Sequence, residues 1–149
     1  MIDFSVFDIW LAMHLAGVVI AVGAVTVTDG FMAFFHLHSK FGKIVKKVAP
    51  LLSMIVWIGF LLISVSGLYF IFDGRLDISN IFVWFKMVLV GVVFLNGIVL
   101  NKFITPKFQE LSVKELESMP MKFEIMAGLS GGISVIGWWS ILFLAYFFI

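Results

Sequence analysis

Four long apolar segments dominate this chain and determine the solvent in which it folds. They cover residues 4–35, 50–72, 81–103 and 123–149. A helix needs about 20 apolar residues to cross the roughly 30 Å hydrocarbon core of a bilayer, because each residue adds only 1.5 Å. Only 13% of the residues are charged, about half the share that is usual in soluble domains. We therefore predict an all-α integral membrane protein with a single four-helix domain.

Short polar segments and prolines indicate where the helices end. We expect an antiparallel up-down four-helix bundle with helices over residues 5–35, 49–72, 80–104 and 122–148. Pro50 is expected at the start of the second helix, where a missing N–H is harmless. Pro106 is expected to end the third helix, because proline does not fit a helix interior. The sequence QELSVKELES at 109–118 predicts a short amphipathic helix at the membrane surface.

The positions of the positive residues predict the orientation of the bundle. All Lys and Arg residues except Arg75 and Lys86 lie in the polar segments at 40–47 and 102–122. Positively charged loops remain in the cytoplasm, so both termini are expected on the extracytoplasmic side. The expected location is the inner (cytoplasmic) membrane, crossed several times, with the lipid bilayer as the main partner. A net charge of +1 gives no reason to expect nucleic acid.

Small residues predict the faces on which the helices pack. Burial of apolar surface does not drive helices together in lipid, so association depends on close backbone approach and on interhelical hydrogen bonds. Gly17 and Ala21 share a stripe with His14 on the first helix, and Gly128 and Gly132 form a small-xxx-small pair on the fourth. We expect these faces to pack within the bundle, and they also offer a surface for a second copy or another membrane protein.

Two ionisable residues enter the membrane from the predicted extracytoplasmic side. His14 lies about 13 Å below the start of its helix and Lys86 about 9 Å below the start of the third. An ionisable residue at such depth is a candidate functional residue. Two structural alternatives stay open. Lys86 can extend its stem to the headgroups, and His14 can be a neutral imidazole that bonds to Ser64, Ser66 or Tyr69.

A second polar group is expected near the lysine-rich side of the membrane. Its members in the apolar helices are Asp29, Asn96, Asn101 and Glu124. Asp29 is interpreted first as a structural contact that pairs with Lys102 or accepts from Asn96, and second as a proton or cation site. His36 and His38 are expected in a solvated loop, because a metal site requires further ligands held rigidly.

Two short motifs carry a resemblance to a known family. His14 is followed by Ala21-Val22-Gly23, and Trp84-Phe85-Lys86 is followed by Met87-Val88-Leu89-Val90. Together with four helices, these segments resemble the CopD and HemJ-type (protoporphyrinogen oxidase-like) superfamily of membrane proteins. The resemblance implies haem b, with His14 as the iron ligand and Lys86 also required. The sequence departs from the family at Ala21, where a Trp is common, and it lacks the Arg of the HemJ-type branch.

The resulting functional hypothesis is a polytopic membrane protein that binds haem b or a porphyrin in the outer half of the bundle and has a redox role. His14 would be the axial ligand, and Lys86 would neutralise a propionate above a pocket floored by Gly17 and Ala21. A bis-His haem within one chain is disfavoured, because only one histidine lies at that depth. No catalytic residue is assigned, and whether the chain is an enzyme stays open. The alternatives are a non-catalytic membrane subunit and a small metal- or solute-handling protein.

Overall fold

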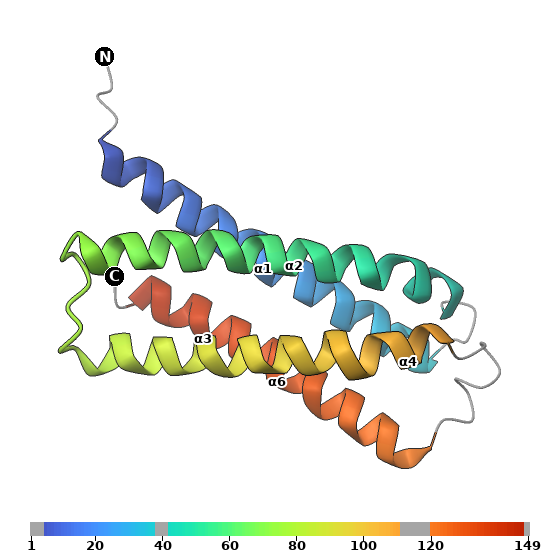
Figure 1. The fold of residues 1–149 in the computed structure, drawn as a ribbon. Helices are drawn as coiled ribbons and strands as arrows, with labels where there is room; N and C mark the ends of the chain where they lie inside the picture. Colours follow the sequence, from blue (N-terminus) through green and yellow to red (C-terminus); the bar gives the residue numbers. More distant parts are fainter. Residues whose placement is uncertain (1–4, 38–41, 111–119, 148–149) are drawn as a thin grey trace.

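The structure is a computed structural model that describes residues 5–37, 42–110 and 120–147, and within these ranges its regular structure is helical. The main elements (Figure 1) are α1 (Val6–Leu37), α2 (Gly42–Phe72), α3 (Ile81–Val99) and α6 (Met121–Phe147). A π-helical segment, η2 (Leu100–Ile104), joins α3 to α4 (Thr105–Glu110). Four spans are long and apolar enough to cross a membrane. The chain is therefore a multi-pass membrane protein with an all-α fold, as predicted.

The helices form two crossed pairs. In Figure 1, α1 lies obliquely across α2, and α6 lies obliquely across α3. These two pairs make the most extensive contacts, and α1 packing on α6 joins them. The start of α1, the end of α6 and the α2–α3 connection at residues 73–80 lie together; we name this the loop end. The opposite end, which carries Lys46, Lys47, Lys102, Lys107 and Lys122, is the lysine end.

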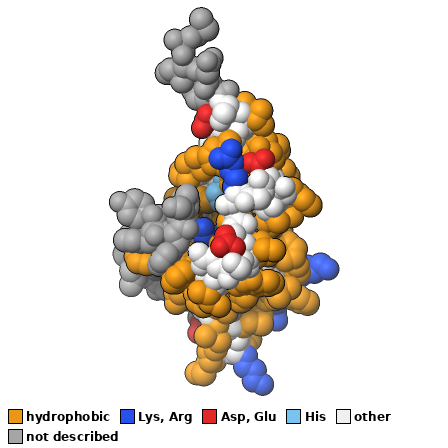
Figure 2. Space-filling view, turned by 90° about the vertical axis from the view of Figure 1, so that its left-hand side faces the viewer, with side chains coloured by type: hydrophobic (Ala, Val, Ile, Leu, Met, Phe, Trp, Pro, Cys, Tyr) orange, Lys and Arg blue, Asp and Glu red, His pale blue; other side chains and the backbone are white. Residues whose placement is uncertain are grey.

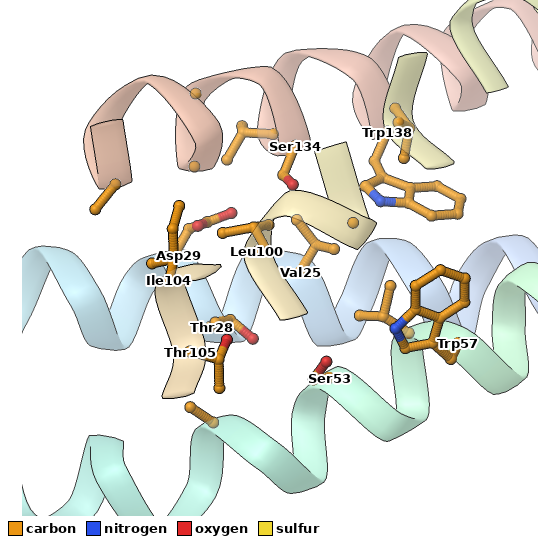
Figure 3. A pocket seen from close by; sticks show the side chains of 18 of the residues that line it. Val25, Thr28, Asp29, Ser53, Trp57, Leu100, Ile104, Thr105, Ser134 and Trp138 are labelled. Atoms are coloured by element: carbon orange, nitrogen blue, oxygen red, sulfur yellow. The ribbon is translucent and has the colours of Figure 1, made fainter. Parts of the chain in front are cut away.

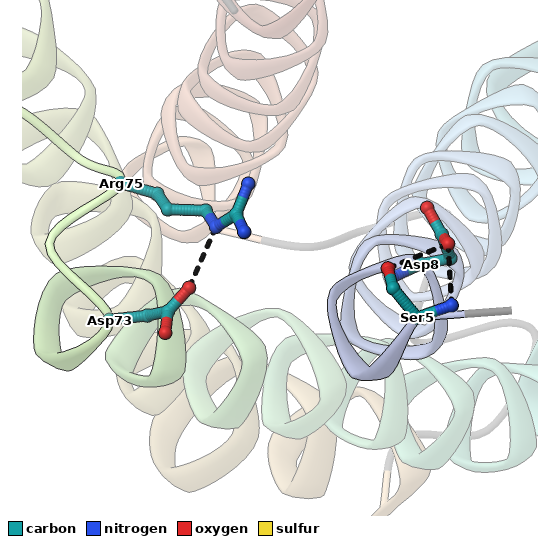
Figure 4. Close-up of polar contacts among 4 residues, drawn as sticks. All are labelled: Ser5, Asp8, Asp73 and Arg75. Carbon is teal, nitrogen blue, oxygen red and sulfur yellow. Dashed lines mark hydrogen bonds and ion pairs between the residues drawn. The ribbon is translucent and has the colours of Figure 1, made fainter.

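Local polar residues begin two of these helices. Ser5 and Asp8 form a reciprocal cap on α1 (Figure 4), in which the Asp8 carboxylate accepts from the Ser5 backbone N–H at 2.9 Å and from its hydroxyl at 2.7 Å. Asn80 caps α3, because its side-chain oxygen accepts from the Phe82 N–H at 2.9 Å. Both helices therefore start where the sequence provides an acceptor for a free N–H group.

Neither proline lies where the sequence analysis placed it. Helix α2 begins at Gly42, so Pro50 lies inside it and removes one backbone hydrogen bond. Pro106 does not end the third helix. The turn before it widens into η2, and the Thr105 N–H bonds to the Leu100 carbonyl, five residues back. The wider turn accommodates a ring that would clash in a regular helix, and the helix continues to Glu110. The predicted surface helix at 109–118 lies, beyond Glu110, outside the described residues.

Glycine packing confirms the prediction on α1. A Cβ atom on Gly17 would lie 2.8 Å from the Gly59 carbonyl oxygen, and one on Gly59 would lie 2.8 Å from the Gly17 oxygen. Ala21 is fully buried in the same crossing. The two backbones therefore approach each other more closely than a side chain at either glycine would permit. This is the packing that small residues allow in lipid.

The prediction for α6 is wrong. A Cβ atom on Gly128 or Gly132 would meet nothing within 4 Å, whereas one on Gly137 would collide with the side chain of Val93 on α3. The glycine that packs closely is thus Gly137. Gly128 and Gly132 line a cavity instead of a helix contact, whereas α3 contacts this part of α6 through the bond from Asn96 to Ser130.

Candidate functional site

His14 is held by a serine on the neighbouring helix. Its Nδ1 atom lies 2.9 Å from Oγ of Ser66, a completely buried residue of α2. The Ser66 hydroxyl has a single hydrogen, which it donates to the Leu62 carbonyl at 2.6 Å. When that hydrogen is donated to Leu62, Ser66 accepts from the Nδ1–H of His14, whereas the other tautomer reverses the roles. In the Nδ1–H tautomer Nε2 carries the lone pair, and it has no hydrogen bond to any described residue. Ser66 is one of the three partners that the sequence analysis named.

An aromatic ring packs against this histidine, and a stacked aromatic pair lies nearby. The floor of the expected pocket is closed. The ring of Phe70 lies 5.5 Å from the His14 ring, centroid to centroid. Trp10 stacks on Tyr69 at 4.7 Å one turn closer to the loop end. Gly17 and Ala21 were expected to leave space beneath His14, but α2 fills that space where it crosses α1 at Gly59. Neither His14 nor Lys86 lines any of the three main cavities between the described residues.

Lys86 reaches the same region from α3. It is half-buried. Lys86 forms no ion pair with any other described residue. His14 and Lys86 belong to helices that have little backbone contact with each other.

The loop end beside this pair carries a few exposed charges. Asp73 and Arg75 form an ion pair at 2.7 Å (Figure 4), and the Arg75 guanidinium lies 4.2 Å from the centre of the Phe7 ring, which ties the connection to α1. Hydrogen bonds from the hydroxyl and N–H of Ser79 lower the pKa of the Asp77 carboxyl. Figure 2, which faces this end, shows these polar groups as a small patch within a hydrophobic surface.

The lysine half of the bundle contains a cavity of about 340 Å³ (Figure 3). It lies between α1, α2, α6 and the segment that runs from α3 to α4, and most of its wall is apolar. Its polar lining residues are Thr28, Asp29, Ser53, Thr105, Gln109 and Ser134. One carboxylate oxygen of Asp29, Oδ2, is buried and has no hydrogen-bond partner among the described residues. The sequence analysis singled out Asp29 but missed the cavity.

The partners expected for Asp29 are engaged elsewhere. Asn96 donates to the Ser130 carbonyl at 2.8 Å and to Ser134 Oγ at 3.0 Å, and it accepts from Ser130 Oγ at 2.6 Å. It therefore connects α3 to α6. Lys102 is exposed and forms no ion pair with Asp29. Neither expected contact is made among the described residues, because both amide N–H groups of Asn96 donate to α6 and Lys102 is exposed.

The remaining polar candidates have separate roles. Asn101 accepts from Ser53 Oγ at 3.0 Å and joins η2 to α2, and Glu124 is exposed near the start of α6. The side chain of His36 and the whole of His38 lie outside the described part of the chain. Among the described residues there is no cluster of three or more His, Cys, Asp or Glu side chains that could hold a metal ion.

Comparisons with known proteins add no relative. No family model, no curated protein and no solved structure matches this chain. The resemblance of the His14 and Lys86 segments to the CopD and HemJ-type superfamily therefore stays a prediction.

Proposed function

We propose that this membrane protein binds haem b or another porphyrin near the loop end, with His14 as the axial ligand. The observation that carries this proposal is the 2.9 Å contact of His14 Nδ1 with Ser66 Oγ, because an Nδ1–H that donates there would leave the Nε2 lone pair for a metal. Histidines that bind metals commonly donate their other ring N–H to a protein acceptor, which fixes both tautomer and ring orientation. Haem iron takes such a neutral imidazole nitrogen.

Lys86 is proposed to hold a propionate. A lysine in a membrane span usually pairs with an anion or lies in water, and this one has no anionic partner among the described residues. A carboxylate group of the porphyrin supplies that partner. When bound, haem would provide one-electron redox chemistry, while His14, Ser66 and Lys86 position it. Among the described residues, His14 is the one histidine at this level that would hold the iron.

The proposal includes an orientation in the inner membrane. With the lysine end in the cytoplasm, His14 and Lys86 open toward the extracytoplasmic side. A reporter enzyme fused after Ile149 is then expected to be active outside the cytoplasm, and one inserted at 107–114 inside it. The reverse pattern would contradict the orientation and leave the haem proposal to be judged by its own test.

A visible spectrum tests the haem proposal. The full-length protein, purified in mild detergent and incubated with hemin, is expected to show a sharp Soret band that His14→Ala abolishes. Lys86→Met should weaken hemin binding and keep the band position. His38→Ala removes a histidine that is 24 residues away from His14 in the sequence and serves as the matched control.

A wild-type protein that stays colourless, or a band that survives His14→Ala, would overturn haem binding. The remaining functions would then be those of a non-catalytic subunit, packing on a second copy or another membrane protein, or of a small metal- or solute-handling protein.

A further inference from the structure

The cavity in the lysine half is independent of the His14 region and has its own chemistry. Among the described residues that line it, Asp29 is the only charged one, and none is Lys, Arg or His. Asp29 extends from α1 toward α6 in Figure 3, and a Cβ atom added to Gly131 would lie 3.4 Å from its Oδ1. The second oxygen, Oδ2, is buried without a hydrogen bond to a described residue. The described residues therefore supply no cation to this carboxylate, whereas a buried anion is normally paired with one.

Two tryptophans form the opposite wall. Figure 3 shows Asp29 at one side of the cavity and Trp57 and Trp138 at the other. Phe60 lies between these indoles, with centroid distances of 6.0 Å to Trp57 and 6.4 Å to Trp138. An occupant that extends across the cavity thus meets a carboxylate at one end and aromatic faces at the other.

The shape of the cavity favours an organic molecule over a bare ion. Its volume of about 340 Å³ lies in the range of small-molecule sites and is roughly ten times the ~30 Å³ share of one water molecule. A divalent metal ion would need further carboxylate or imidazole ligands, and the described residues hold no such cluster. Most of the wall would remain untouched by a single ion.

Sequence features on three helices keep this space open. Gly128 and Gly132 line the cavity, and a Cβ atom on either would meet nothing within 4 Å. On the other side, α2 and α3 touch through rings, with Phe94 5.6 Å from Trp57 and 5.2 Å from Phe60. The missing side chains and the bulky aromatic spacers together prevent the bundle from closing around Asp29.

We propose that this cavity binds a small organic ammonium compound, whose N–H group donates to Asp29 and whose apolar body lies against Trp57 and Trp138. The hydroxyls of Thr28, Thr105 and Ser134 line the same space and can take up further N–H donors. The ligand class follows from the pairing of one unpartnered carboxylate with an otherwise apolar wall, and it does not depend on haem binding.

A calorimetric titration tests this site in the full-length protein. The protein is placed in nanodiscs of zwitterionic lipid and titrated with 2-phenylethylamine, a protonated amine with an aromatic body, and the signal of empty discs is subtracted. 2-Phenylethanol, which is neutral and nearly the same size, is the ligand control. We expect saturable amine binding at one site and at least tenfold weaker binding of the alcohol.

Three variants assign the binding to the cavity. Asp29→Asn keeps the size of the side chain and should weaken amine binding at least tenfold. Glu124→Gln removes an exposed carboxylate outside the cavity and should leave binding unchanged. Gly132→Leu should fill the space and abolish binding, while far-ultraviolet circular dichroism confirms that the variant is folded.

Three results would overturn the proposal: equal amine binding by Asp29→Asn, equal binding of the alcohol and the amine, or no saturable binding by the wild type. The last result would assign the space to lipid chains beside a neutral Asp29. None of them bears on the hemin spectrum, so the two functions can fail separately.

Discussion

The two sides of α2 show opposite ways of packing a helix in a membrane. Toward α1, backbone lies on backbone, because Gly17 and Gly59 face each other and a Cβ atom on either would meet the carbonyl oxygen of the other at 2.8 Å. Toward α3, contact is made by the rings of Trp57, Phe60 and Phe94, and a cavity lies beside them. One side leaves no room for a ligand, and the other leaves room around a carboxylate.

The glycines of α6 teach the same lesson. Gly137 packs against Val93, whereas a Cβ atom on Gly132, five residues earlier on the same helix, would meet nothing within 4 Å. A small residue therefore allows close packing only where another helix approaches at its level. Elsewhere the same residue creates space.

The largest expected effect concerns the closed side. Gly59→Leu would place a side chain against the backbone of α1, so we expect the free energy of unfolding to fall by about 3 kcal/mol, at the upper end of overpacking effects. Thermal unfolding in detergent, followed by circular dichroism, measures this change. Gly67→Leu on the same helix is the control, because no atom lies within 4 Å of its added Cβ. Equal effects of the two substitutions would contradict the close crossing.

The open side is expected to respond with the opposite sign. Asp29→Leu removes a buried carboxylate oxygen without a described partner and should raise the free energy of unfolding by about 1–2 kcal/mol, the usual penalty of an unsatisfied polar group. Glu124→Gln, at an exposed position, should change little. A loss of stability in Asp29→Leu would mean that the carboxylate has a structural partner. It would contradict the contrast between a closed side and an open side of α2.

A smaller effect is expected between the two sides, where Asn96 joins α3 to α6. Asn96→Ala removes its hydrogen bonds to Ser130 and Ser134 and should lower stability by about 1 kcal/mol, since such bonds in membranes contribute only modestly. Ser130→Ala should cost a similar amount, and the double variant should lose less than the sum of both. Full additivity would show that the two residues do not interact.

The smallest expected change is a gain at the cavity wall. Gly132→Ala adds a methyl group to open space and lowers the backbone entropy of the unfolded chain, so stability should rise by about 0.5 kcal/mol. Gly137→Ala is the matched change on the same helix and should be destabilising, because the methyl group would meet Val93. If both alanine variants are destabilised equally, the glycines of α6 all face neighbouring helices.

Parts of the candidate site could be predicted from the sequence of each helix taken alone. A bond of His14 to one of three residues on α2 was left open as a structural alternative to a functional role, and Ser66 is the partner found. The small stripe at Gly17 and Ala21 was also interpreted correctly. The surroundings of Asp29 were not, because the expected partners Asn96 and Lys102 were chosen by depth along the helix axis. Depth alone does not tell which way a side chain points around that axis.

The membrane fold and the number of spans follow from properties that lie along the chain itself. Apolar length matches bilayer thickness, and in lipid each helix satisfies its own backbone hydrogen bonds, so the four spans need no knowledge of their neighbours. The π-helical accommodation of Pro106, the contact of Gly17 with Gly59 and the cavity at Asp29 were decided by the tertiary structure. They depend on how each helix is rotated and tilted against the others, and in lipid those angles are set by side-chain packing between helices.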